Sequence, residues 1–186
     1  MDPIITYHNP VEDERYIVHN RLVLIDQIPS IKRRFETFTQ YASTPFGKSF
    51  TEEELQDSFE GRASRLASTM LINKDGKSFD VLDLPEIAQI STINDFLISD
   101  VNKDGHMDLI GVGNNYAQET LFGRYDASLG VVLLGDGNLN WTPYDNVKAN
   151  FILSGDTRNI ANLKSAQGNL LLITNNNSEA QFFLYR

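Results

Sequence analysis

A short run of oxygen-bearing side chains, residues 100–108, has the composition and spacing of a cation-binding loop. It reads D-x-N-x-D-G-x-x-D, so side-chain oxygens recur at its first, third, fifth and ninth positions. Ca²⁺ takes about six to eight oxygen ligands, and Gly105 at the sixth position permits the tight curl that brings such ligands together. Without a cation, three carboxylates so close in sequence would repel one another. The sequence therefore predicts one Ca²⁺ ion with these ligands: Asp100, Asn102, Asp104, the backbone carbonyl of His106, and Asp108.

The segments beside this loop decide what kind of calcium site it is. An EF-hand needs a bidentate Glu at the twelfth loop position and a helix on each side, but the twelfth position here is Gly111. Residues 95–99 before the loop and 109–113 after it both have the character of strands. We therefore expect a calcium loop inside a β-hairpin rather than an EF-hand or a dockerin, with an ion that is structural and does not act as a switch.

Short apolar runs separated by Gly, Asn and Asp clusters continue through residues 67–186, a pattern typical of an all-β array. Together with the helical signals near the N-terminus, they predict a mainly β fold with an N-terminal mixed helical segment. The predicted strands of the β-rich part are 69–72, 95–98, 109–112, 130–134, 150–153, 170–173 and 181–185.

The N-terminal part, residues 1–66, reads as a hairpin followed by short helices. The hairpin strands are expected at 4–7 and 15–18. Asn20 is a suitable N-cap for the helix that follows it, and Thr51 begins a T-x-x-E capping box for another. The apolar residues at helical spacing are Ile31, Phe35, Phe38, Leu55 and Phe59.

Two patterns in the β-rich part occur twice at a similar offset. A strand leading to Asp-Gly and then an aromatic residue occurs at 71–79 and again at 133–141. A Gly, an apolar strand and an Asn cluster occur at 105–115 and again at 168–177. Such self-similarity favours repeated structural units, with chance similarity among Gly- and Asn-rich loops as the alternative. The expected repeats are 67–128 and 129–186.

The second expected repeat lacks the calcium ligands. When Gly168 is aligned with Gly105, the positions of the first and last carboxylates are occupied by Leu163 and Leu171. We therefore expect one calcium ion and not two.

The composition restricts the partners and the chemistry. The 186 residues include 16 Lys and Arg against 25 Asp and Glu, a net charge of −9, which disfavours binding to nucleic acid or to an anionic membrane surface. Cysteine is absent, so disulfides and thiolate metal sites are excluded. No apolar run reaches the ~18 residues of a membrane span. Because Met1 stands almost directly before a predicted strand, we expect a piece of a longer protein, with a complete cytoplasmic protein as the alternative.

Residues 100–114 resemble an FG-GAP/VCBS repeat, the blade unit of integrin-α-type β-propellers, and 75–79 resembles the end of a preceding repeat strand. Other stretches resemble the C-terminal part of large exported bacterial proteins that carry VCBS repeats and often an ASPIC/UnbV module: 20–35, 41–42, 123–128 and 133–137. The resemblance implies a partial β-propeller-like array of about two blades, bound Ca²⁺, an extracytoplasmic location and no enzymatic activity. Two units are too few to close a propeller, so the remaining blades are expected in a longer parent chain.

Other candidate sites are weaker. The histidines, which are not at metal-ligand spacing with one another, are His8, His19 and His106. The acidic run Glu52–Glu54 suits the first turn of a helix better than acid–base catalysis. Asp126 beside Arg124 and Ser128 suggests a hydrolase site, but no histidine is near in sequence. Aromatic candidates for a glycan- or peptide-binding face, for which packing between blades is the favoured alternative, are Tyr116, Phe122, Tyr125, Trp141 and Tyr144.

These features predict a non-catalytic, calcium-stabilised scaffold or binding segment of an exported bacterial protein, with a protein or glycan as ligand. The alternative is an accessory part of an extracytoplasmic hydrolase that acts on carbohydrate or phosphoester substrates. A convergent nucleophile–base pair or a second metal cluster would favour the hydrolase, and the sequence contains neither pattern.

Overall fold

The computed structural model describes residues 3–118, 123–166 and 168–185. Two compact units make up the chain, one ending at Arg62 and the other beginning at Ala63. The boundary expected from the sequence, after residue 66, falls in the irregular segment before the first strand of the second unit. None of the described helices is long and apolar enough to cross a bilayer.

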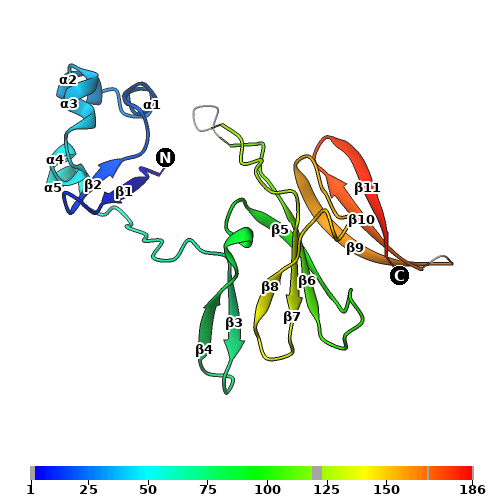
Figure 1. Ribbon diagram of the computed structural model, residues 1–186. Coiled ribbons are helices and arrows are strands. Elements are labelled where there is room, and N and C mark those ends of the chain that lie inside the picture. The colour runs from blue at the N-terminus through cyan, green and yellow to red at the C-terminus, as the bar shows by residue number, and fades with distance from the viewer. Residues whose placement is uncertain (1–2, 119–122, 167, 186) are drawn as a thin grey trace. The chain divides into compact units, whose positions relative to one another are not determined.

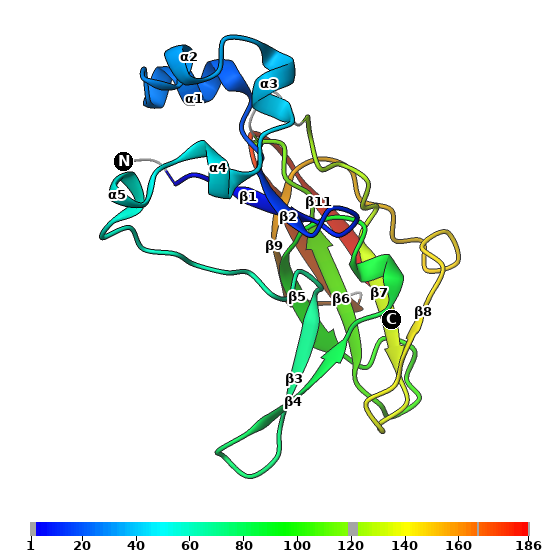
Figure 2. The same cartoon turned by 90° about the vertical axis from the view of Figure 1, so that its left-hand side faces the viewer.

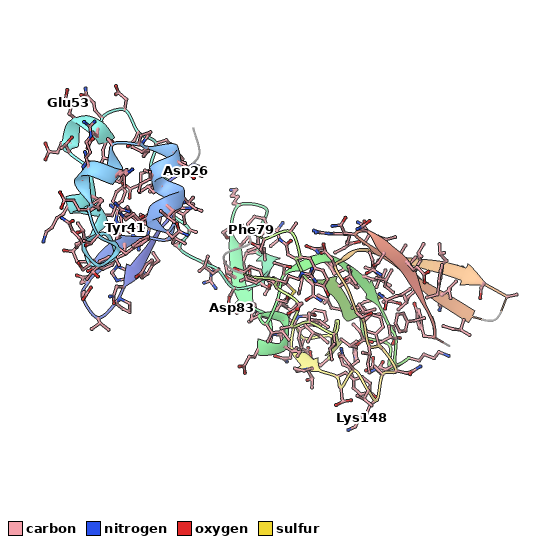
Figure 3. All side chains as sticks on the ribbon, turned by 90° about the horizontal axis from the view of Figure 1, so that it is seen from above. Asp26, Tyr41, Glu53, Phe79, Asp83 and Lys148 are labelled. Atoms are coloured by element: carbon pink, nitrogen blue, oxygen red, sulfur yellow. The ribbon has the colours of Figure 1, made fainter. Side chains whose placement is uncertain are left out.

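The described part of the N-terminal unit combines one antiparallel hairpin, as predicted, with short helices (Figure 1). Its elements are β1 (Thr6–Asn9), β2 (Glu14–Ile17), α1 (Arg21–Gln27), α2 (Ile31–Arg34), α3 (Phe38–Ala42), α4 (Phe46–Ser49) and α5 (Glu52–Leu55). Leu24, Ile31 and Phe35 form its buried core. Tyr41 packs against that core (Figure 3), so a small apolar cluster holds the unit together.

Two predicted helix starts in this unit are confirmed. The side chain of Asn20 accepts the N–H of Val23 at 3.0 Å, which caps α1. The capping box that begins at Thr51 has both of its hydrogen bonds. The apolar stripe expected along that second helix is wrong, because α5 is a single turn that ends before Phe59, whose exposed fraction is 95%.

The C-terminal unit contains three antiparallel sheets in its described residues (Figures 1 and 2). Their strand orders are β3-β4, β5-β6-β7-β8 and β11-β10-β9. The strands are β3 (Thr69–Asn73), β4 (Phe79–Asp83), β5 (Ile93–Ser99), β6 (Asp108–Gly113), β7 (Val131–Gly135), β8 (Trp141–Pro143), β9 (Thr157–Ser165), β10 (Gly168–Asn175) and β11 (Ser178–Tyr185), and the 3-10 turn η1 (Glu86–Ala88) precedes β5. In both views the β3–β4 hairpin projects beyond the other two sheets.

The middle strands of the four-stranded sheet, β6 and β7, are largely buried on both faces. Ile110 and Val132 pack in one cluster with residues of the C-terminal sheet such as Leu171. Leu109 and Leu133 pack in a second cluster on the other face. Successive side chains of a strand point to opposite faces, so this sheet is covered on both sides. The covering holds in place the loops at the ends of β6 and β7, one of which is the Asp-rich loop.

The mainly β prediction is confirmed, but individual strands differ from it. No strand forms at 150–153. Phe151 and Leu153 instead enter the core from an irregular segment, and their burial explains the apolar pattern. Strand β9 was not predicted, because most of its residues are polar and exposed. The boundary expected after residue 128 falls between β6 and β7, which pair within one sheet.

Candidate metal centre

The Asp-rich loop joins two strands, as predicted. It connects β5 to β6, and the antiparallel register of these strands pairs Ser99 with Asp108 at the base of the loop. Two loop residues, Lys103 and Gly105, have left-handed backbone angles, with φ of 63° and 91°. Glycine adopts this conformation without a Cβ clash, so Gly105 has the role in the curl that the sequence predicts for it.

The carboxylate of Asp100 lies inside the curl. Its Oδ2 accepts the N–H of Gly105 at 3.0 Å. Its Oδ1 is buried and has no hydrogen-bond partner in the described part of the chain. A buried carboxylate oxygen without a partner calls for a ligand, an ordered water or an ion. Oδ1 of Asp156 is also buried and unpartnered, so the oxygen of Asp100 points to an ion only together with the other oxygens of its loop.

Asn102 and Asp104 are exposed at the loop tip and are linked to each other and to the next turn. Oδ1 of Asn102 accepts the N–H of Asp104 at 3.0 Å, and its amide donates to Oδ2 of Asp104 at 2.8 Å. Oδ1 of Asp104 accepts the N–H of His106 at 2.8 Å. The His106 N–H, and after it the Asn102 amide, lower the pKa of Asp104 below its ordinary value. Asp104 is therefore a carboxylate at neutral pH.

The carboxylate of Asp108 is fully buried and anchors the loop to the sheet. Its Oδ2 accepts the N–H of Val101 at 2.8 Å, within the loop. Its Oδ1 accepts the N–H of Gly135 at 3.0 Å, at the end of β7. Each oxygen retains a second lone pair, so these two bonds are compatible with its predicted role as a ligand.

Two glycines beyond the loop make its position possible. A Cβ on Gly135 would collide with the backbone carbonyl of Met107, and a Cβ on Gly137 would collide with the imidazole of His106. Both glycines belong to the Gly-Asp-Gly cluster that begins at the last residue of β7, for which the sequence predicts only a place in a repeat. Two glycines only two residues apart at the end of a predicted strand were the signal in the sequence; their closeness to the loop follows from the pairing of β6 with β7.

The donor atoms of these residues are of the kind that Ca²⁺ prefers. The predicted set offers the orphaned Oδ1 of Asp100, the carboxylates of Asp104 and Asp108, the amide oxygen of Asn102 and the carbonyl of His106. A Ca²⁺ ion binds an oxygen at ~2.3–2.6 Å, whereas a water molecule lies ~2.7–2.8 Å from the oxygen that it hydrogen-bonds. Because the ion is smaller, it can contact a buried oxygen, such as Oδ1 of Asp100, that a water molecule does not reach. Within the described ranges, no three His, Asp or Glu side chains lie together as a metal-binding group. Asp100, Asp104 and Asp108 are therefore not gathered around one point as they stand, and a bound ion would have to draw them together.

The remaining candidate residues do not gather at this loop. His8 and His19 lie in the N-terminal unit. Glu52–Glu54 occupy the first turn of α5. Asp126 is exposed, while Ser128 is buried and its hydroxyl accepts the N–H of Gly130 at 3.1 Å.

The predicted aromatic face is divided among several environments. Trp141 packs against the cluster formed by Leu109 and Leu133. The ring of Tyr116 lies under the guanidinium of Arg124 at 4.8 Å. Tyr125 is exposed, Tyr144 lines a groove described below, and Phe122 lies outside the described residues.

The two leucines aligned with the first and last carboxylates lie within strands. Leu163 is in β9 and Leu171 is buried in β10. The hairpin β9–β10 closes between Ser165 and Gly168, so it has no loop of the length of 100–107.

Comparisons of the chain with protein-family models, with curated proteins and with solved structures found no match. The functional argument therefore depends on the geometry of the loop and of the sheets that carry it.

Proposed function

We propose that this chain is a calcium-stabilised, non-catalytic scaffold and binding segment of β-propeller type, from an exported bacterial protein related to those with FG-GAP/VCBS repeats. Its ligand would be a protein or a glycan, and further blades would come from a longer parent chain. The observation that carries the proposal is the buried, unpartnered Oδ1 of Asp100 inside a glycine-curled loop of carboxylates and amides.

The arrangement of the sheets supports the propeller-type part of the proposal. β5-β6-β7-β8 is a four-stranded antiparallel meander, and β9-β10-β11 is a three-stranded one that follows it directly. The two pack face to face through one apolar cluster. Polar contacts join their first strands, since the amide of Asn94 donates to the carbonyl of Thr157 at 2.7 Å and the N–H of Ile160 donates to Asp95 at 2.9 Å. Propeller blades are four-stranded sheets arranged around a central channel, and two successive meanders that pack against each other are compatible with two such blades.

Bound calcium would neutralise the carboxylates of the loop. In the chain itself, Asp108 already ties the loop to β7, and Gly135 lets the two backbones approach closely enough for that tie. An ion at the loop therefore reinforces the β5–β6 connection. Extracellular calcium modules bind with Kd on the order of 10⁻⁴–10⁻³ M, which suits the proposed location outside the cytoplasm.

The test is thermal unfolding of calcium-loaded protein with and without chelator. A ligand in hundredfold excess over its Kd stabilises the folded state by about 2.7 kcal/mol, which corresponds to a Tm change of about 5–10 °C for a protein of this size. We expect chelation to lower Tm by this amount and Asp104→Ala to abolish the difference.

Asp75→Ala is the matched control. Asp75 is an exposed turn aspartate whose carboxylate accepts the N–H groups of Lys77 and Ser78, much as Asp104 accepts that of His106. This variant should keep the full response to chelator. An unchanged melting curve in protein shown by metal analysis to be calcium-loaded would refute the structural role of the ion.

A further inference from the structure

Strand β11 forms an unprotected edge of the C-terminal sheet. In the described part of the chain it pairs with β10 and with no other strand. Its residues are SEAQFFLY, with Glu179 as the one charged side chain and no proline. By contrast, β8 at the edge of the four-stranded sheet is short and ends in Pro143, and β4 carries Asp80 and Asp83. Exposed edges of natural sheets are normally blunted by such charges, prolines or short lengths, so the uncharged end of β11 suggests that another strand covers it.

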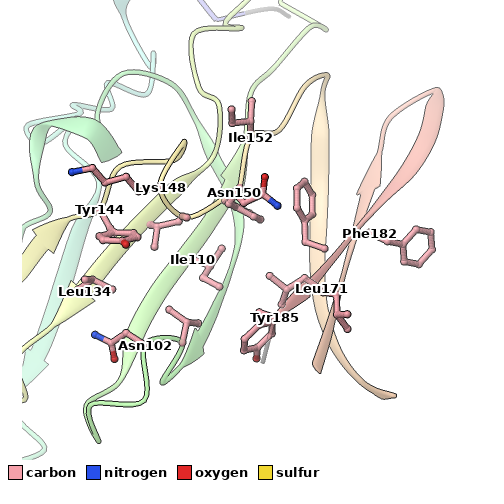
Figure 4. Close-up of a pocket in the computed structure, with 16 residues that line it drawn as sticks. Asn102, Ile110, Leu134, Tyr144, Lys148, Asn150, Ile152, Leu171, Phe182 and Tyr185 are labelled. Atoms are coloured by element: carbon pink, nitrogen blue, oxygen red, sulfur yellow. The ribbon is translucent and has the colours of Figure 1, made fainter. Parts of the chain in front are cut away.

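A groove of about 870 Å³ lies beside this edge (Figure 4). On the four-stranded sheet it touches alternate residues of β7, Val132 and Leu134, as expected for a groove on one face. On β11 it touches every residue of 182–185. Successive side chains of a strand point to opposite faces, and Figure 4 shows Phe182 and Tyr185 on opposite sides of β11. A groove that reaches both sets runs along the edge of the strand, where backbone groups lack partners.

The groove combines an apolar floor with a polar rim. Of the lining residues, Ile110 and Leu171 are buried and form its floor, whereas Tyr144, Lys148 and Asn150 are exposed and form its rim. Lys148 is the one charged residue among those that line it. Within the described residues, no carboxylate lies within 4.0 Å of its ammonium group, and Figure 3 shows its side chain at the periphery of the unit. An occupant that carries a carboxylate would complement this charge.

We propose that an extended peptide segment of a partner protein adds to β11 as a fourth strand. Its backbone pairs with the free edge, its apolar side chains on one face enter the groove against Val132 and Leu171, and an acidic side chain meets Lys148. Addition of a strand to a free sheet edge is an established mode of peptide recognition, in which the backbone supplies affinity and pockets for alternate side chains supply specificity. This inference rests on the proposed scaffold function and names its partner chemistry.

Two other occupants fit the groove less well. A second copy of the chain brings a net charge of −9 against an equal charge, which opposes self-association. An acyl chain could fill the apolar floor, but it has no backbone groups that could pair with the N–H and C=O groups of the β11 edge. A peptide strand satisfies the floor, the edge and Lys148 together.

The experiment measures fluorescence anisotropy of a labelled probe peptide, Thr-Val-Thr-Val-Thr-Glu-Thr, with the full chain in calcium buffer. Two control peptides have the same side chains but carry N-methyl groups on either the odd or the even residues, so each blocks hydrogen bonding along one edge. We expect saturable binding of the probe and at least about tenfold weaker binding of one N-methylated peptide, because several backbone hydrogen bonds are lost. Equal binding of all three peptides, or no binding of the probe, overturns the proposal.

Charge reversal tests the proposed contact between Lys148 and the acidic side chain of the peptide. Lys148→Glu should weaken binding of the probe by about fivefold, and replacing the Glu of the peptide by Lys should restore it. Lys164→Glu, on an exposed part of β9, is the matched control and should change nothing. Equal effects of the two variants would contradict the predicted contact.

The other occupants give distinct results. A dimer in sedimentation that Leu184→Lys dissociates would assign the edge to a second copy and overturn the proposal, as would displacement of the probe by laurate together with equal binding of the N-methylated peptides. The chelator experiment has a separate readout, the melting temperature. A failure of peptide binding therefore does not affect the calcium result, and a melting curve that chelator leaves unchanged does not affect the peptide result.

Discussion

The hairpins β5–β6 and β9–β10 have the same antiparallel pairing and contribute to the same apolar cluster, but they close in different ways. The first closes through residues 100–107, a polar loop that contains an orphaned carboxylate oxygen. The second closes across Ser165 and Gly168 with only residues 166 and 167 between them. Core packing therefore does not require the long loop, and the Asp-rich composition of 100–107 has a purpose other than joining two strands.

The two hairpins are also fastened at opposite ends by different carboxylates. Asp108 lies where the loop meets β6 and binds the N–H groups of Val101 and Gly135. Asp156 lies just before β9, at the open end of the second hairpin, and accepts hydrogen bonds from Arg158 at 2.7 Å and Asn176 at 3.1 Å. Asp108 holds the loop of the first hairpin, whereas Asp156 holds the open end of the second hairpin. Removal of the two carboxylates should therefore have different consequences.

The largest effect is expected from the loss of the Asp108 carboxylate. Asp108→Ala leaves the part-buried N–H of Val101 and the buried N–H of Gly135 without acceptors, and we expect a loss of about 3–5 kcal/mol in the free energy of unfolding. Urea unfolding in the presence of chelator measures this cost without a contribution from calcium. Asp108→Asn keeps one acceptor oxygen and should lose less. A cost below about 1 kcal/mol for Asp108→Ala would show that both hairpins depend on core packing alone.

A smaller effect is expected from the glycine that lets the loop approach β7. Gly135→Ala places a Cβ against the carbonyl of Met107, and we expect a loss of about 1–3 kcal/mol in the free energy of unfolding from the forced backbone shift, together with a weaker response to chelator. Gly111→Ala, in the neighbouring strand, is the control. Its Cβ would meet only side chains, at 3.5 Å from Ile93 and Val131, and should cost less than about 1 kcal/mol. Similar costs for the two variants would contradict the steric argument.

The smallest effect is the dependence of stability on pH that comes from the Asp156 carboxylate. Burial raises the pKa of Asp156, but hydrogen bonds from Asn176 and Arg158 outweigh burial and lower the pKa below its ordinary value of 3.8. The stability from this carboxylate is therefore fully present above about pH 4 and is lost as the pH falls through the lower folded-state pKa. We expect the wild-type Tm to fall more steeply than that of Asp156→Asn between about pH 4 and pH 2. Parallel curves would mean that Asp156 does not titrate with unfolding.

Local patterns predicted much of the fold correctly. Strand character on both sides of the Asp-rich loop, the cap at Asn20 and the box at Thr51 each depend on a few neighbouring residues, and the structure has all of them. The expected strand at 150–153 was wrong, because an apolar run indicates burial whether or not the backbone is extended. Strand β9 was missed for the converse reason, since its pairing with β10 and not its composition makes it a strand.

The sequence by itself determined the spacing of the candidate ligands and the glycine that curls the loop, because both lie within one short segment whose backbone preferences are local. Only the tertiary structure decided that Asp108 binds Gly135, that one oxygen of Asp100 is left without a partner, and that the edge of β11 faces a groove. Each of these depends on which distant strands pair and pack, and on the solvent that their packing excludes. Such long-range pairing leaves no regular spacing in a single sequence.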